Sequence, residues 1–152
     1  MTFDDRAWKT GLAVGITIWL TRMLHVENPI FAMIGAVVSI QPTLTKSLKE
    51  GAHRFTGTAI GAVVGLLMNY FRAGNPVLGG LGVVITIEIC RWLKMEGPVV
   101  IASVVTLAII FYKGPDTVYY ALERVFDTLL GVLVATGVNF LALPGKEFKQ
   151  EE

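Results

Sequence analysis

The sequence predicts an all-α fold: an integral membrane bundle of six helices built as two inverted three-helix repeats. The first observation is composition, since 53% of the 152 residues are hydrophobic and only 16% are charged. An ordinary soluble domain carries roughly 25% charged residues. The second is a series of long uncharged stretches, and the third is an internal repeat. Together they indicate that lipid surrounds most of this chain.

Six stretches contain no Asp, Glu, Lys or Arg, and most approach the roughly 17 to 25 residues that a spanning helix needs. These stretches are residues 10–21, 28–45, 55–71, 73–87, 97–112 and 128–145. The alternative is a soluble bundle, whose helices would show polar faces at a 3.6-residue period. The fifth and sixth stretches are apolar all round, which favours the membrane.

The first helix is predicted to begin near Asp4 or Asp5, either of which can cap a helix start, and to end near Leu24. No small-residue cleavage pattern follows it, so we expect it to be retained as the first membrane helix. Pro29 suits the first turn of a second helix, which extends to Ile40.

A third helix is predicted over residues 45–71, beginning in a polar stretch and continuing into the membrane. Along it Gly57, Gly61 and Gly65 recur every four residues, and Gly131 repeats Gly61 seventy residues later. Such a stripe of small residues lets another helix approach closely. These glycines are therefore predicted to pack helices.

Proline and glycine turns divide the remaining chain into three more helices. They are predicted over residues 76–93, 98–112 and 117–143. Glu96-Gly97-Pro98 breaks the chain as Glu27-Asn28-Pro29 did earlier. The second half of the sequence therefore has the helix order of the first half.

The repeat is visible residue by residue. At an offset of 69, seven of the fourteen pairs between residues 16–29 and 85–98 are identical. At an offset of 70, five of the seventeen pairs between residues 54–70 and 124–140 are identical. The sequence thus contains two copies of a three-helix unit.

These copies cover residues 8–72 and 77–143 of a transmembrane module expected over residues 1–145, and a charged cytoplasmic tail follows over 146–152. Because three is odd, consecutive copies must enter the membrane from opposite sides. That arrangement is an inverted-topology repeat, with a pseudo-twofold axis in the membrane plane.

Charge distribution predicts a multi-pass protein of the cell membrane with both termini cytoplasmic. This orientation leaves four cations outside, namely Arg22, Arg72, Lys113 and Arg124. The other nine lie inside: Arg6, Lys9, Lys46, Lys49, Arg54, Arg91, Lys94, Lys146 and Lys149.

Inverted repeats are characteristic of transporters, in which the substrate lies near the midplane and helix N-termini point at its anionic groups. The helices that open at Pro29 and Pro98 are predicted to supply two such N-termini. The sequence therefore predicts a site for a small organic anion between the two copies.

Two symmetry-related pairs of cations are candidates for this site: Arg54 with Arg124, and Arg22 with Arg91. An ionisable residue at membrane depth indicates function by default. The alternative is that each arginine, lying near a helix end, extends to the headgroups as an anchor. Arg22 and Arg91 also have glutamate neighbours that could neutralise them.

Glu88 and Asp127 are candidates for proton coupling, because each carboxyl lies at the edge of an uncharged stretch. A structural ion pair is the alternative for both. Asp127 lies three residues after Arg124, and Glu88 three residues before Arg91, which is within helical pairing distance.

The sequence lacks the motifs that indicate a metal site, an enzyme active site or a nucleic-acid-binding surface. His25 and His53 are 28 residues apart with no nearby cysteine, so metal-ligand spacing is missing. No nucleophile elbow or phosphate-binding glycine loop occurs. A net charge of +1 without a Lys/Arg run gives no nucleic-acid groove. The sequence therefore predicts no enzyme, no cofactor, no metal and no nucleic-acid partner.

An ordered set of motifs resembles the aromatic acid exporter and fusaric acid resistance superfamily, in its Gram-positive single-module branch. The resemblance covers about residues 8–143. The motifs are Asn28-Pro29-x-Phe31-Ala32, Ser39-x-Gln41-Pro42-Thr43, Gly57-Thr58-x-x-Gly61, Cys90-Arg91 and Ala121-x-x-Arg124-x-x-Asp127-Thr128-x-x-Gly131.

The resemblance implies a six-helix membrane module that exports small organic anions such as aromatic carboxylates. An organic-anion channel, as in the distantly similar plant malate channels, is one alternative. A membrane dimerisation or sensor module without transport is another. Related proteins carry two modules or act as dimers, which implies a homodimer here. The family usually carries a cytosolic helical domain after the membrane module, beyond the part that the resemblance covers.

Overall fold

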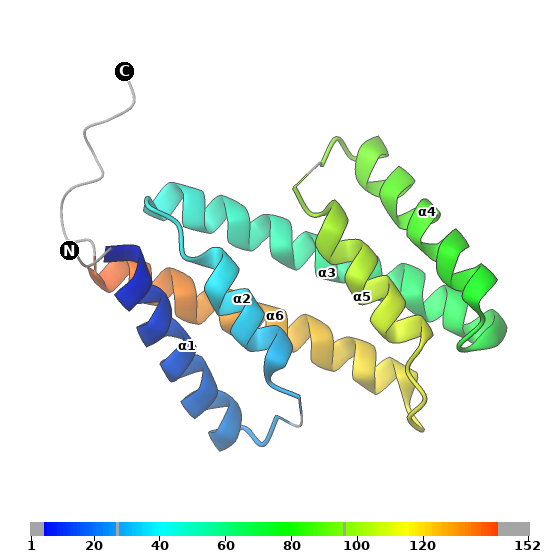
Figure 1. Cartoon of the computed structure of the whole chain (residues 1–152), viewed down its shortest axis with the longest axis horizontal. Helices are drawn as coiled ribbons and strands as arrows, with labels where there is room; N and C mark the ends of the chain where they lie inside the picture. The colour runs from blue at the N-terminus through cyan, green and yellow to red at the C-terminus, as the bar shows by residue number, and fades with distance from the viewer. Residues whose placement is uncertain (1–4, 27, 96, 143–152) are drawn as a thin grey trace. The chain divides into compact units, whose positions relative to one another are not determined.

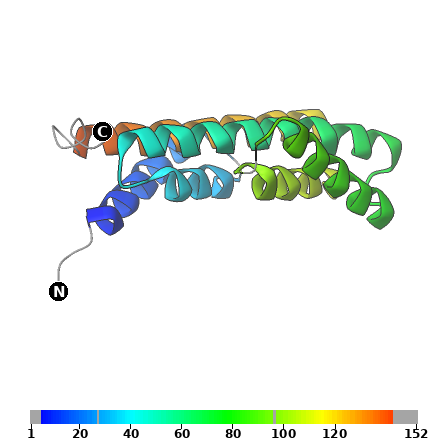
Figure 2. The same cartoon turned by 90° about the horizontal axis from the view of Figure 1, so that it is seen from above.

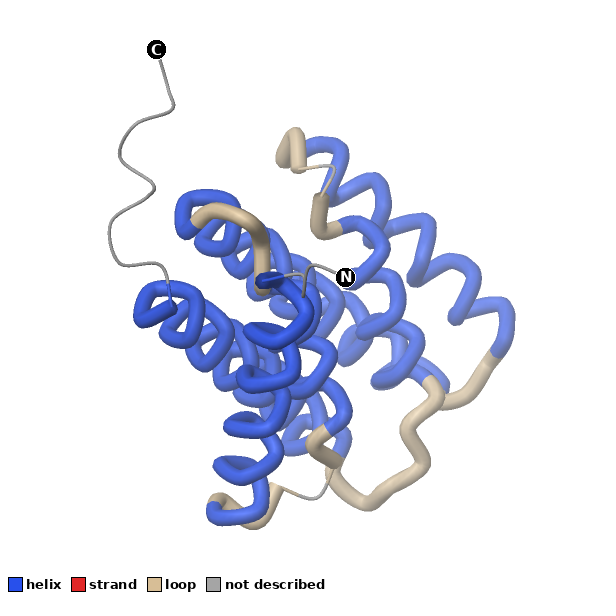
Figure 3. Tube along the Cα trace, turned by 60° about the vertical axis from the view of Figure 1, so that its left-hand side comes forward, coloured by secondary structure: helices blue, strands red, loops and turns tan. Residues whose placement is uncertain are grey.

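A computed structural model describes residues 5–26, 28–95 and 97–142. The described residues form six α-helices and no strand (Figure 3), so the predicted all-helical fold is confirmed. The predicted tail over residues 146–152 lies outside them. In chain order (Figure 1) the helices are α1 (Asp5–Met23), α2 (Ile30–Ser39), α3 (Leu44–Arg72), α4 (Pro76–Trp92), α5 (Val99–Ile110) and α6 (Thr117–Ala142).

The helices differ in whether they are long and apolar enough to cross a membrane. Among the described residues one helix is long and apolar enough to cross a membrane, α6 over Thr117–Leu141. The apolar helices α2 and α5 have 10 and 12 residues. At 1.5 Å per residue they extend about 15 and 18 Å, against a hydrocarbon core of about 30 Å. The number of helices among the described residues is as predicted. Of these helices, α6 has the length and apolar composition needed to cross a membrane.

The described chain divides into two compact units. The first contains α1, α2, the start of α3 up to Ala52, and α6 from Asp127 onward. The second contains α3 from His53 onward, α4, α5, and the start of α6 up to Phe126. Each long helix therefore contributes one part to each unit.

In the first unit, α1 packs against α2 (Figure 1), and the core contains residues from α1, α2, α6 and the turn after α2. Gly131 of α6 lies directly on the backbone of α2, because a Cβ atom there would clash with the carbonyl oxygen of Ala32. The core residues are Ala13, Ala36, Ile40, Ala135 and Val138.

In the second unit, α4 packs against α5, and α5 in turn lies along α3 (Figure 2). The contact between α3 and α5 is made at glycines. A Cβ atom at Gly61 would clash with the carbonyl oxygen of Ala102, and one at Gly57 would come within 2.8 Å of the carbonyl oxygen of Pro98. Only glycine therefore permits this backbone-to-backbone approach.

Local backbone structure recurs in the two halves of the chain. His25 and Lys94, which are 69 residues apart, follow α1 and α4 and adopt left-handed φ angles of 53° and 55°. Val26 N–H donates to the Thr21 carbonyl at 2.9 Å. Met95 N–H, again 69 residues later, donates to the Cys90 carbonyl at the same distance. The two turns thus have the same form.

Burial recurs as well. The buried residues of α2 are Ala32, Gly35, Ala36 and Ser39. At an offset of 70 the corresponding residues of α5 are Ala102, Val105, Thr106 and Ile109, and all four are buried. The two short helices therefore bury the same face.

Candidate functional site

Arg124 of α6 is the largest side chain with no exposed surface in the described structure. Its Nη2 donates a hydrogen bond of 2.9 Å to Oε2 of Glu123, and this carboxylate side chain is 12% exposed. A buried cation is costly unless it is paired, and the Glu123 carboxylate supplies a counter-charge.

Two tyrosines lie beside Arg124 as well. The guanidinium carbon lies 4.7 Å from the ring centroid of Tyr120, one helical turn earlier. The ring of Tyr112 stacks on Tyr120 with the centroids 4.0 Å apart and the planes 10° from parallel. Together Tyr112, Tyr120, Glu123 and Arg124 form a continuous group, which we name the Arg124 cluster.

The segment between α5 and α6 positions Tyr112. Gly114 leaves room for it, since a Cβ atom at this residue would overlap the hydroxyl and ring of Tyr112. The side chain of Asp116 caps α6 by accepting the backbone N–H of Tyr119 at 2.9 Å. The turn thus fixes the start of the helix that carries Tyr120 and Arg124.

The structure separates the four arginines that the sequence singled out. Arg54 and Arg124 are buried, at 4% and 0% exposure. Arg22, in the last turn of α1, and Arg91 of α4 are exposed. Burial of a charge in an apolar bundle is unfavourable and is retained for a reason, so Arg54 and Arg124 are the stronger candidates.

Arg91 pairs with Glu88 across one helical turn, with 2.8 Å between Nη1 and Oε1. The i, i+3 pairing expected from the sequence is therefore present. Both side chains are more than half exposed, at 68% and 61%. An exposed ion pair of this kind contributes about 0 to 1 kcal/mol.

Asp127, the other carboxyl that the sequence singled out, has no exposed surface. It is the first α6 residue of the first unit. The sequence suggested Asp127 as the helical partner of Arg124, and the Arg124 cluster adds Glu123 as a partner at 2.9 Å. Asp127 is therefore a buried carboxyl and Glu88 is an exposed one.

Pro29 and Pro98 each stand immediately before a helix, with helical backbone angles. Their carbonyl oxygens accept the N–H groups of Met33 and Ala102, at 3.0 and 2.9 Å. As N-cap residues, the two prolines offer no side-chain acceptor to their helices. The helix dipole makes each of these helix starts partially positive, which favours a nearby anion.

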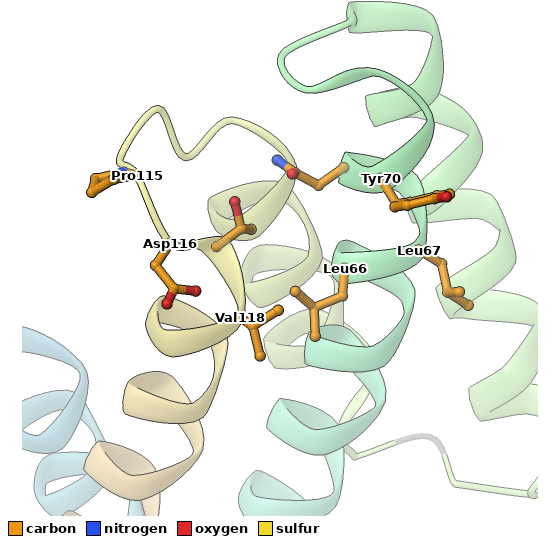
Figure 4. A pocket seen from close by; sticks show the side chains of 8 residues that line it. Leu66, Leu67, Tyr70, Pro115, Asp116 and Val118 are labelled. Carbon is orange, nitrogen blue, oxygen red and sulfur yellow. The ribbon is translucent and has the colours of Figure 1, made fainter.

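An open pocket of about 520 Å³ lies in the second unit between the end of α3 and the start of α6 (Figure 4). Leu66 and Val118 face each other across it, and Asp116 stands at its loop side. Because the Asp116 carboxylate is the charged group in its lining, the pocket does not suit an organic anion. None of the residues predicted for the anion site lines it. The lining residues are Leu66, Leu67, Asn69, Tyr70, Pro115, Asp116, Thr117 and Val118.

Tyr112, Tyr120 and Glu123 are not among the site residues predicted from the sequence. The i, i+4 spacing of Tyr120 and Arg124 is a signal that could have identified their contact. No spacing rule predicts Tyr112, since it lies in the segment between two helices. In the described part of the chain, no three His, Cys, Asp or Glu side chains gather closely enough to hold a metal ion.

Comparison with known proteins assigns the chain to a family. Residues 1–142 match the family model described as "Aromatic acid exporter family member 1". No solved structure matches the chain.

Several curated bacterial proteins are also similar. The chain is 34% identical over 146 residues to the UPF0421 protein YgaE of Bacillus subtilis, covering 96% of this chain and 41% of that protein. It is 34% identical over 141 residues to a UPF0421 protein of Halalkalibacterium halodurans, covering 93% and 40%. A UPF0421 protein of Staphylococcus epidermidis is 34% identical over 148 residues, covering 97% and 45%. The chain thus spans less than half the length of these relatives.

Proposed function

The chain belongs to the aromatic acid exporter family, and we propose that it is a cell-membrane transport module that exports small organic anions such as aromatic carboxylates. The observation that carries this proposal is the complete burial of Arg124 within Thr117–Leu141, the helix that is long and apolar enough to span a membrane. A cation at such a position is a functional residue by default, and a carboxylate is its natural ligand.

We propose further that the module is an inverted repeat, with Arg54 and Arg124 as equivalent residues. Their offset of 70 is the offset at which α2 and α5 bury the same face. The same offset relates the contact of Gly61 with Ala102 to that of Gly131 with Ala32. These recurrences support two copies of one unit, and the odd number of helices in each copy supplies the inversion.

In this proposal Arg54 and Arg124 attract the carboxylate electrostatically along its path. The helix starts after Pro29 and Pro98 add the positive ends of two helix dipoles for the same anionic group. The exposed Arg22 raises the local concentration of anions near the path without binding them tightly, and Arg91, which is paired with Glu88, adds less.

The test is flux of benzoate into and out of proteoliposomes that contain the purified chain. We expect Arg54→Gln and Arg124→Gln each to reduce the initial rate at least about tenfold, because each removes a buried charge from the path. Arg22→Gln is the matched control, since it removes an exposed cation, and a change below about twofold is expected. Unchanged flux in both buried-site variants, with the elution profile of the wild type, would contradict the site assignment.

Proton coupling is the second part of the proposal, with Asp127 and Glu88 as the candidate carriers. Asp127 is favoured because it is buried, whereas Glu88 is exposed and paired with Arg91. With an imposed pH gradient, Asp127→Asn should abolish the gradient-driven part of the flux, and Glu88→Gln should leave it unchanged. If both variants keep the full response to the gradient, neither carboxyl carries the proton.

The proposed multi-pass topology, with both termini cytoplasmic, is tested by single-cysteine labelling. Cys90 is buried and is first replaced by serine. A cysteine at Lys94 should then react with an impermeant thiol reagent from the inside, and one at Lys113 from the outside. Both positions are exposed in the structure. The reverse pattern would invert the orientation.

A further inference from the structure

The contacts of the Arg124 cluster have the chemistry of a bound aromatic acid. The Tyr112 ring covers Tyr120 as a ligand's ring would, at a centroid distance of 4.0 Å. The Glu123 carboxylate pairs with the Arg124 guanidinium as a ligand's carboxylate would, at 2.9 Å. The chain thus supplies both halves of an aromatic carboxylate from its own side chains.

We infer that Tyr120 determines specificity for aromatic over aliphatic carboxylates, and that Tyr112 and Glu123 occupy the binding site when substrate is absent. This inference rests on the proposed function. The substrate's ring replaces Tyr112 on Tyr120, and its carboxylate replaces Glu123 at Arg124.

Such an exchange has a physical advantage. Leaving a buried arginine without a counter-charge is strongly unfavourable. An empty site, in which the Arg124 guanidinium had no carboxylate beside it, would carry this cost. When one carboxylate replaces another, Arg124 stays paired throughout. Stacking on Tyr120 is likewise retained, because one ring takes the place of the other.

The two replaced groups, Tyr112 and Glu123, both have exposed surface. Glu123 is 12% exposed whereas Arg124 has no exposed surface, so the pair has an outer and an inner member. Tyr112 belongs to the segment between α5 and α6 and is only partly buried. Tyr120 and Arg124 remain in place on α6 as the fixed part of the site.

The test measures equilibrium binding of radiolabelled benzoate to the purified chain in detergent, with competition by unlabelled cyclohexanecarboxylate. These two acids share charge and ring size, and only one is aromatic. We expect benzoate to bind about five- to tenfold more tightly, the ratio to which an aromatic pair corresponds. Tyr120→Leu should bring this ratio close to one, while Tyr120→Phe, which keeps the ring, should preserve it.

Tyr112→Ala and Gly114→Ala provide an independent pair of variants outside the helices. The first removes the competing ring, and the second displaces it, because the new Cβ atom overlaps the Tyr112 hydroxyl. Both should strengthen benzoate binding about threefold or more. If Tyr120→Leu does not fold, these two variants still test whether Tyr112 competes with the substrate's ring for Tyr120.

Equal binding of the two acids by the wild-type chain, or no binding of either, would overturn the inference. So would an undiminished ratio in Tyr120→Leu, or weaker benzoate binding in both Tyr112→Ala and Gly114→Ala. Selective binding together with an absence of flux in proteoliposomes would instead leave the inference standing and contradict the proposed export.

Discussion

The side-chain amide of Asn139 donates a hydrogen bond of 2.7 Å to the hydroxyl of Ser47, and both residues are fully buried. The same amide donates to the Gln41 carbonyl at 3.0 Å, just beyond the end of α2. Asn69, seventy residues before Asn139, donates to the carbonyls of Ile109 and Ile110 at the end of α5. In each compact unit an asparagine thus donates to a carbonyl at or just beyond the end of a short apolar helix.

We expect Asn139→Leu to lower the free energy of unfolding by about 1 to 3 kcal/mol, because it leaves buried polar partners without their donor. Asn69→Leu should cost less, since Asn69 is only partly buried and water can replace its amide. Unfolding in detergent, followed by circular dichroism, measures both. A smaller loss for Asn139→Leu than for Asn69→Leu would contradict this ranking.

Gly131 and Gly137 form a matched pair on α6. A Cβ atom at Gly131 would meet the backbone of Ala32, whereas one at Gly137 would meet nothing within 4 Å. We therefore expect Gly131→Ala to destabilise the fold by about 2 kcal/mol or more. Gly137→Ala should stabilise it by about 0.5 to 1 kcal/mol through helix propensity. Thermal unfolding of the two variants in the same detergent checks the opposite signs.

Thr86 and Thr106 share a buried hydrogen bond of 2.9 Å between their hydroxyls. Each hydroxyl also lies within bonding distance of a carbonyl in its own helix, that of Gly82 or Ala102. We expect Thr86→Val and Thr106→Val each to cost about 1 kcal/mol, and the double variant to cost clearly less than their sum. Strict additivity in a double-mutant cycle would show that the bond between the hydroxyls contributes nothing.

His25 and Lys94 adopt left-handed backbone angles that favour glycine. His25→Gly and Lys94→Gly should each stabilise the fold by about 0.5 to 1 kcal/mol, since both side chains are exposed and the strain is removed. The midpoint of thermal unfolding should rise for each. Gly74, which already has a φ of 69°, is the reverse control, and Gly74→Ala should lower it.

Much of the fold could be predicted because prolines and glycines mark where the helices stop. Helix bounds placed at Pro29, Pro76 and Pro98 agree with the structure to within about two residues. Helix length was harder to judge, because an uncharged stretch does not reveal how much of it is helical. Residues 28–45 carry no charge, and α2 uses ten of them.

The candidate site was less predictable. The 70-residue repeat and the positions of the charged residues identified Arg54, Arg124 and Asp127. All three are buried in the structure. The same reasoning also named Arg22 and Arg91, as weaker candidates because of their glutamate neighbours, and both are exposed. A sequence does not show how deep a helix end lies. The stacking of Tyr112 on Tyr120 depends on the path of a turn, which no helical spacing encodes.

The chain passes between its two compact units within α3 and α6, and not in a loop. If the backbone were cut in the turn at residues 73–75, the first fragment would keep α1 and α2 but lose the α6 segment that packs on them. The second would keep α4 and α5 and lose the α3 segment that carries Gly57, Gly61 and Gly65. Neither fragment can complete a unit from its own residues. Each compact unit therefore forms only when both halves of the chain are present.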